Sequence, residues 1–164
     1  MQNAKDTFYL MIQSRLASLN PARNIVLRGL IRPGILVDEN ELPTASQLTD
    51  TFRLAWTTLH LATASPMPWV ALECAIHYAT DGSPANAGMD RGRLLAAMDA
   101  ELTAALAQHP HTAPKLNYTT TPPTNMVTNI FWADPIFGSL ITTGESLART
   151  ATVQVFAYQE AGEL

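Results

Sequence analysis

Residues 69–79, WVALECAIHYA, show an apolar side chain at every second position. The apolar positions are Val70, Leu72, Cys74, Ile76 and Tyr78. A period of two is that of a β-strand with one buried face, because successive side chains of a strand point to opposite sides. The segment therefore predicts a half-buried strand whose second face is packed less completely.

Further strands are predicted on both sides of this segment. Residues 51–61 and 148–158 alternate in the same way, and residues 126–132 (MVTNIFW) also indicate a strand. Residues 24–38 are rich in β-branched and aliphatic side chains and are interrupted at Pro33-Gly34. They predict two short strands joined by a turn at that dipeptide, or one bent strand.

Two segments carry the helical period instead. In residues 5–19 the apolar side chains recur at helical spacing, and Asp6 or Thr7 could cap the start of the helix. In residues 90–109 an apolar stripe follows one helical face, with Asp90 as the candidate cap. The sequence therefore predicts two amphipathic helices.

The order of these elements predicts the fold class. Strands come in runs between the two helices, without regular βαβ alternation. We expect an α+β fold with a mixed, mainly antiparallel sheet and both helices packed on one face. The 164 residues suit one domain. Within it, the Pro/Thr-rich residues 110–125 are expected to form an exposed, extended loop, and the acidic residues 159–164 to fray.

Charge and cysteine content narrow the possible functions. The net charge is −4 and only 15% of residues are charged, which disfavours a chain built to neutralise nucleic-acid phosphates and hints that protein partners cover much of the surface. Cys74 is the only cysteine, so neither an internal disulfide nor a cysteine-based zinc cluster can form. No apolar run reaches the roughly 18 residues of a membrane span, and no signal peptide is recognisable. We expect synthesis in the cytoplasm and no membrane partner.

The residue types that carry catalysis do not form a recognisable set. His109 and His111 flank Pro110, but the sequence places no third metal ligand beside them. Cys74 lies among apolar neighbours, which is typical of an inert buried thiol. Phosphate-binding glycine motifs and the GxSxG motif are absent from the sequence. We therefore predict no catalytic, cofactor or metal site, and a binding or structural protein rather than an enzyme.

Charged residues in three places are the candidate contacts with other subunits or partners. Two arginines begin the helix of residues 90–109, two flank a strand end near Pro33-Gly34, and three carboxylates share one loop. The candidate interface residues are Arg28, Arg32, Arg91, Arg93, Asp38, Glu39 and Glu41. Ordinary surface ion pairs and a solvated acidic turn are the plainer interpretations of the same residues.

Several stretches together resemble the tail terminator (tail completion) proteins of tailed bacteriophages and the related cap proteins of contractile injection systems. They are the strand, loop and helix ALECAIHYATDGS…DRGRLLAAMDAELTAAL, the last strand RTATVQVFAYQE and the first helix KDTFYLMIQSRLASL. The resemblance covers most of the chain as a pattern of elements and includes no catalytic motif.

The resemblance implies a hexameric ring that caps the tail tube, ends its growth and joins the tail to the neck or head connector. Its partners would be other copies of the chain, the tube protein, the connector and, in a contractile tail, the sheath protein. The protein would belong to the virion, and DNA would only pass through the lumen. A closed ring needs a head-to-tail interface, for which the expected sheet edges 126–132 and 148–158 offer free backbone groups.

Two other functions stay open. The chain could be a small ligand-binding domain with an apolar pocket between the sheet and helix 90–109. It could also be an enzyme whose acid and base meet only in the folded chain, with Glu73, His60 and His77 as the nearest candidates.

Overall fold

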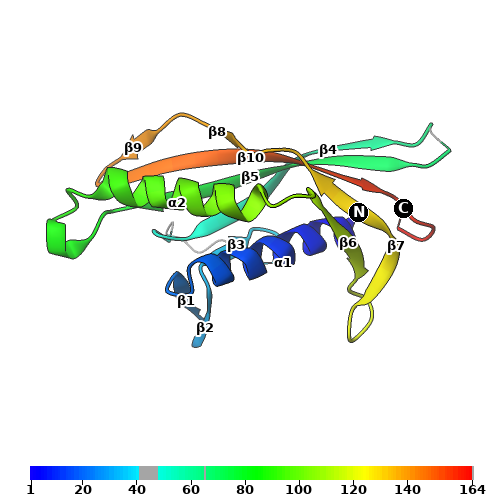
Figure 1. Cartoon of the computed structure of the whole chain (residues 1–164), viewed down its shortest axis with the longest axis horizontal. Coiled ribbons are helices and arrows are strands. Elements are labelled where there is room, and N and C mark those ends of the chain that lie inside the picture. The colour runs from blue at the N-terminus through cyan, green and yellow to red at the C-terminus, as the bar shows by residue number, and fades with distance from the viewer. Residues whose placement is uncertain (41–47, 65, 164) are drawn as a thin grey trace.

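The structure, a computed structural model, describes residues 1–40, 48–64 and 66–163. Its helices are α1 (Gln2–Leu19) and α2 (Arg91–Leu106), and a 3₁₀ turn, η1 (Pro84–Asn86), precedes α2. The strands are β1 (Asn24–Leu27), β2 (Leu30–Pro33), β3 (Ile35–Val37), β4 (Phe52–Ala62), β5 (Trp69–Thr80), β6 (Thr112–Asn117), β7 (Thr124–Trp132), β8 (Ile136–Phe137), β9 (Ile141–Thr143) and β10 (Ser146–Tyr158). Figure 1 shows their arrangement.

Eight of these strands form one sheet in the order β3-β4-β5-β10-β7-β6, with β8 and β9 also paired to β10. The pair β3–β4 is parallel and the other pairs are antiparallel. The hairpin β1–β2 stands apart as a sheet of two strands. The predicted α+β class and the mixed, mainly antiparallel sheet are confirmed.

The strand β10 lies in the middle of the sheet. One of its edges pairs with β5 along its length, from Leu147 opposite Thr80 to Tyr158 opposite Trp69. Its other edge pairs in turn with β9, β8 and β7. The strand β7 lies between β10 and β6. The prediction that residues 126–132 and 148–158 offer free edges was therefore wrong, because alternation marks a strand with one buried face but not its place in a sheet.

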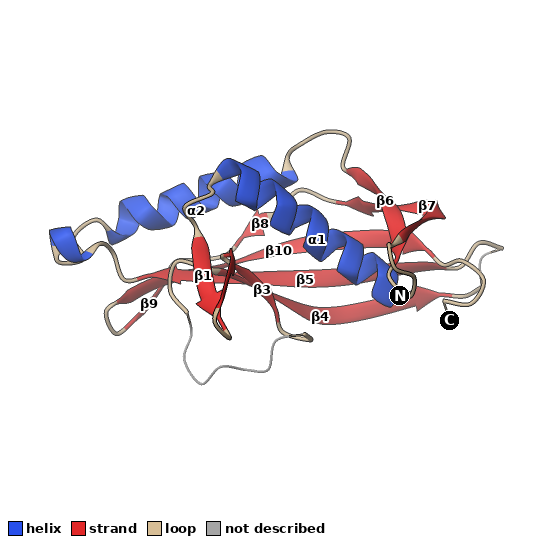
Figure 2. Ribbon diagram, turned by 90° about the horizontal axis from the view of Figure 1, so that it is seen from below, coloured by secondary structure: helices blue, strands red, loops and turns tan. Residues whose placement is uncertain are grey.

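Both helices cover the same face of the sheet. The core joins Phe8, Ile12 and Leu16 of α1 and the apolar stripe of α2 to the inward side chains of β4, β5 and β10. Figure 2 shows the helices in front of the sheet, with the hairpin β1–β2 on one flank of α1 and β6 on the other. The opposite sheet face, called the outer face below, carries no helix of the described chain.

The hairpin turn does not lie at Pro33-Gly34. It lies at Arg28-Gly29, whose φ angles of 52° and 79° are those of a two-residue turn with both central residues left-handed. Pro33 instead ends β2, and the following Gly34 lies against Arg23, with 2.9 Å between its backbone nitrogen and the Arg23 carbonyl oxygen. The sequence obscured this turn because arginine seldom adopts a positive φ.

Residues 110–125 form an exposed loop only in part, at 119–123, and not along the whole length that their composition predicted. They contain β6, which pairs with β7 over Thr112–Phe131 to Asn117–Thr124. A register shift between Pro114 and Leu116 turns Lys115 into the protein, where its side chain is fully buried. An edge position also tolerates Pro114, which has no N–H to donate.

The acidic tail does not fray either. Glu163 accepts a hydrogen bond from Lys115 Nζ at 2.6 Å, and Glu160 accepts one from the Thr128 hydroxyl at 2.7 Å. These contacts fold the segment after β10 back over the hairpin β6–β7. Two carboxylates that looked solvated in the sequence therefore belong to the structure of this end of the molecule.

The predicted cap of the first helix was wrong, whereas Asp90 does occupy the N-cap position of α2. The helix α1 begins at Gln2, so Asp6 and Thr7 lie inside it. The Asp90 carboxylate, however, makes no cap hydrogen bond to the helix. It accepts hydrogen bonds from Ser83 and Asn86 instead, and these hold its pKa well below the usual range. The acid thus fixes the loop that enters α2.

Candidate functional site

The four candidate arginines lie in two separate places. Arg28 is exposed in the turn of the hairpin β1–β2 and makes no ion pair within the described chain, while Arg32 donates a hydrogen bond to the Tyr9 hydroxyl at 3.0 Å. Arg91 donates to the Asp81 carbonyl oxygen at 3.1 Å and forms an ion pair with Glu145. Arg93 is exposed on α2. The structure does not bring these arginines together into one anion site.

Two of the three acidic candidates are already neutralised by cations of the same chain. Asp38 forms an ion pair with Arg53, and Glu39 forms one with Lys5. Glu41 lies outside the described residues. The predicted acidic loop therefore presents less free charge to a partner than its sequence suggests.

The candidate acid and base residues do not form a catalytic set. Glu73 accepts hydrogen bonds from Thr57 at 2.7 Å and Gln154 at 2.9 Å, His77 Nδ1 lies 2.8 Å from the Thr150 hydroxyl, and His60 packs against Trp69. Within the described chain no hydrogen bond joins any two of Glu73, His60 and His77. Burial lowers the pKa of His77, which favours its neutral form.

The other residues considered for chemistry, Cys74, His109 and His111, are buried or stacked against neighbouring side chains. Burial raises the pKa of the Cys74 thiol far above its usual range, so the thiolate that reactivity needs is suppressed. His109 and His111 stack face to face, with ring centroids 4.2 Å apart, and His111 stacks in turn on Trp132. In the described ranges no three His, Cys, Asp or Glu side chains are placed to hold a metal ion.

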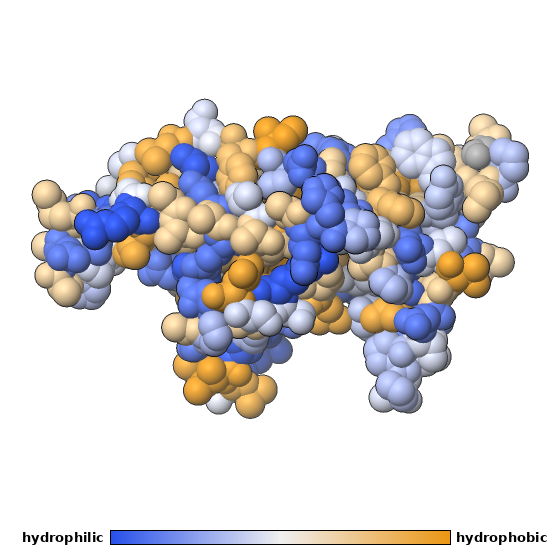
Figure 3. Space-filling model, in the orientation of Figure 1, coloured by the Kyte–Doolittle hydropathy of each residue, from blue (hydrophilic) through white to orange (hydrophobic). Residues whose placement is uncertain are grey.

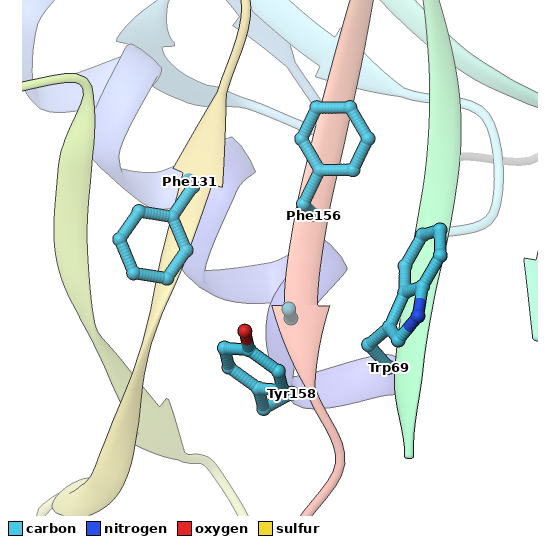
Figure 4. Close-up of a pocket in the computed structure, with 5 residues that line it drawn as sticks. Trp69, Phe131, Phe156 and Tyr158 are labelled. Carbon is cyan, nitrogen blue, oxygen red and sulfur yellow. The ribbon is translucent and has the colours of Figure 1, made fainter. Parts of the chain in front are cut away.

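The outer face of the sheet carries an aromatic groove of about 470 Å³. It is lined by Trp69, Phe131, Phe156, Ala157 and Tyr158. Phe156 lies opposite Phe131 on one side and opposite the small Ala71 on the other, so the space beside its ring stays open toward Trp69. Figure 4 shows the four rings around this space, with a helix behind the strands. The sequence left open an apolar pocket on the other face, between the sheet and the helix of residues 90–109. On that face Leu95, Met98 and Leu102 of α2 are buried in the core.

The hairpin β1–β2 presents an apolar tip to solvent. Val26 is 69% exposed, Leu30 71% and Ile31 76%, and these three residues are called the hairpin tip below. Figure 3 shows hydrophobic side chains gathered at this projection. The base of the hairpin is tied down by Arg23, which donates to both carboxylate oxygens of Glu101 at 2.7 and 2.9 Å. A fixed base and an exposed apolar end are typical of a contact element.

Open strand edges lie on opposite sides of the described part of the sheet. The strand β3 pairs with β4 only as far as Leu54, so the outer edge of β4 from Ala55 to Ala62 has no partner strand there. On the other side, β8 and β9 pair only with β10 and expose Ile136 and Ile141.

The outer edge of β6, by contrast, is partly covered by α1. The backbone nitrogen of Leu116 donates to the Thr7 hydroxyl at 3.1 Å, and that of Tyr118 donates to Asn3 Oδ1 at 3.3 Å. Unpaired edges are places where another chain can add a strand. The outer edges of β4 and of β8–β9 are therefore the candidate assembly surfaces.

The sequence could not have located these surfaces, because it does not state which strands lie at an edge. Residues 24–31 did give one indication of an exposed surface. A short strand pair with aliphatic side chains on both faces must either be covered on both faces or leave one of them exposed. Searches for a matching family model and for a matching curated protein sequence found none. No helix in the described ranges is both long and apolar enough to span a membrane.

Proposed function

We propose that the chain is a structural protein that assembles head to tail into a closed ring. The observation that carries this proposal is the pair of open strand edges on opposite sides of one sheet. The two edges differ, so pairing one with the other makes a heterologous contact, which either closes into a ring or extends into a filament. Such pairing would also satisfy backbone groups that natural proteins seldom leave bare.

The ring we propose is the hexamer of a tail terminator, in a phage tail or a contractile injection system. This part rests on the resemblance of the two helices and the strands around α2 to that family. The proposed partners are the tail tube protein, the neck or head connector protein and, where the tail is contractile, the sheath protein. In this proposal the protein acts in the virion, is made in the host bacterium and lets DNA pass through its lumen.

Light scattering at several concentrations tests ring formation. A particle of six times 17.8 kDa, with a central hole in electron micrographs, is the expected result. A mass that stays at 17.8 kDa throughout contradicts self-assembly. Tube capping is tested by adding the chain to polymerising tail tube protein and measuring tube lengths. Shorter tubes of uniform length are expected, and unchanged lengths contradict the terminator function.

The aromatic groove favours a second candidate, a ligand-binding domain. Its volume falls in the roughly 300–1,000 Å³ range of small-molecule sites, and its lining is mostly aromatic. A ligand that fills it would raise the melting temperature of the wild type and have no effect on Trp69→Ala, since only binding to the folded state stabilises it. A melting screen with planar apolar compounds separates this candidate from the ring.

A further inference from the structure

A concave surface lies on the flank of α1 opposite to the hairpin tip. It is a groove of about 320 Å³ between α1 and β6, called the α1–β6 groove below. Its apolar lining comes from Leu10, Met11, Ala113, Pro114, Leu116 and Tyr118. Leu10 and Pro114 are exposed, so this apolar surface faces water in the isolated chain.

The hairpin tip and the α1–β6 groove are placed for a contact between copies and not within one. Figure 2 shows the hairpin β1–β2 and β6 on opposite flanks of α1. The hairpin leads directly into β3, at one end of the strand order, and β6 is at the other end. When copies lie side by side in a ring, the hairpin flank of one chain faces the β6 flank of the next.

Opposite charges lie in the hairpin turn and beside the α1–β6 groove, where Asp6 lines a neighbouring hollow that shares Tyr118 with the groove. Arg28 in the hairpin turn is exposed and has no ion pair in the described chain. Asp6 lies on α1 one turn before Leu10 and accepts a hydrogen bond from Gln2 Nε2 at 2.9 Å, but forms no ion pair with any described residue. Burial raises the pKa of Asp6, so its carboxylate would gain from a nearby cation.

We propose that the hairpin tip of one copy of this chain inserts into the α1–β6 groove of the next copy, with Arg28 beside Asp6. This inference rests on the proposed self-assembly and adds a second pair of contact surfaces to the open strand edges. It gives an exposed aliphatic element a concave apolar partner and leaves neither exposed to water. The two surfaces differ, so the contact is head to tail and compatible with a closed ring.

Disulfide trapping between two variants tests this contact. A tagged Ile31→Cys chain is mixed with an untagged Met11→Cys chain under mild oxidation. Cys74 is buried and does not interfere. The expected product is a dimer that contains one chain of each kind, and neither variant alone should form it. Replacing Met11→Cys by Met89→Cys gives the matched control, since Met89 is 88% exposed but outside the groove.

A charge at the tip provides the second measurement. Ile31→Asp is expected to raise the concentration for half-assembly at least tenfold, whereas Met89→Asp leaves it unchanged. Both residues are exposed, so both variants keep the fold.

Three results would overturn the inference. A wild-type hexamer without the mixed disulfide removes the hairpin contact but leaves the ring standing. Linkage of Ile31→Cys chains to one another shows a symmetric contact instead. A wild type that stays monomeric overturns the inference together with the ring.

Discussion

Replacing Lys115 by Met tests whether one buried ammonium group holds the end of the chain in place. The Lys115 side chain has no exposed surface. Its Nζ donates to the Tyr158 carbonyl oxygen and to Glu163 Oε2, both at 2.6 Å, and lies 3.6 Å from Glu160 Oε1. Methionine keeps a similar apolar stem but has no charge. The Lys115→Met variant therefore leaves two carboxylates without their shared cation.

The expected loss of unfolding free energy follows from the ion pairs that the two carboxylates lose. Removing one partner of a buried ion pair costs about 3–5 kcal/mol. The lower end applies here, because Glu163 keeps a hydrogen bond from the Glu160 backbone nitrogen at 2.8 Å and Glu160 keeps its bonds from Thr128. A loss of about 3 kcal/mol lowers the melting temperature of a domain of this size by about 6–12 °C.

Thermal unfolding followed by circular dichroism measures this change. The matched control is Lys5→Met, which removes the only other lysine. Lys5 pairs with Glu39 at the surface, so its loss is expected to cost about 1 kcal/mol or less. Melting of Lys115→Met within 2 °C of the wild type, or a larger loss in Lys5→Met, would refute the reasoning about the buried cluster.

Three further outcomes follow from the structure. Burial alone would raise the pKa values of Glu101 and Glu163, but hydrogen bonds from Arg23 and Asn20 to Glu101, and from the Glu160 backbone and Lys115 to Glu163, hold both pKa values below the ordinary 4.5. The stability that these two carboxylates contribute is therefore full above that pH and is lost as the pH falls below it. Urea unfolding at pH 7 and at pH 3.5 should show this loss. Gly34→Ala places a Cβ 2.9 Å from Arg23 Cγ and should lower the free energy of unfolding, measured in urea, by about 1–3 kcal/mol. Gly92→Ala, at a position of α2 where the new Cβ meets only open space, should instead raise the free energy of unfolding by about 0.5–1 kcal/mol. Cys74 should react with a thiol reagent only after denaturation, and rapid labelling of the native protein would contradict its burial.

The sequence predicted those elements that bury one face, because burial of one face gives their apolar residues a regular period. The strand β5 and the helix α2 each bury one regular set of side chains, so their patterns were legible without the fold. The strand β6 was missed because its buried residue is Lys115, a charge that becomes acceptable inside only beside Glu160 and Glu163. Those partners lie 45 and 48 positions away, beyond the reach of a local pattern.

The candidate surfaces were predictable only in part. The sequence indicated a protein that meets partners, but it directed attention to arginines and acids that are largely paired within the chain. The hairpin tip was hidden because Val26, Leu30 and Ile31 look like ordinary core residues of a strand. Which apolar side chains remain outside depends on the position of the hairpin relative to the main sheet, and that is set by contacts such as Arg23 with Glu101.

The central place of β10 has a consequence during synthesis. The strand β5 is complete at Thr80 and can pair at once with β4, but its other antiparallel partner, β10, begins only at Ser146, more than sixty residues later in translation. The strands β8 and β9 gain their only described partner at the same late moment. A chain interrupted before Ser146 therefore lacks both the complete sheet and the β8–β9 edge that is proposed to join neighbouring copies in the ring. Broken translation products would thus be excluded from assembly.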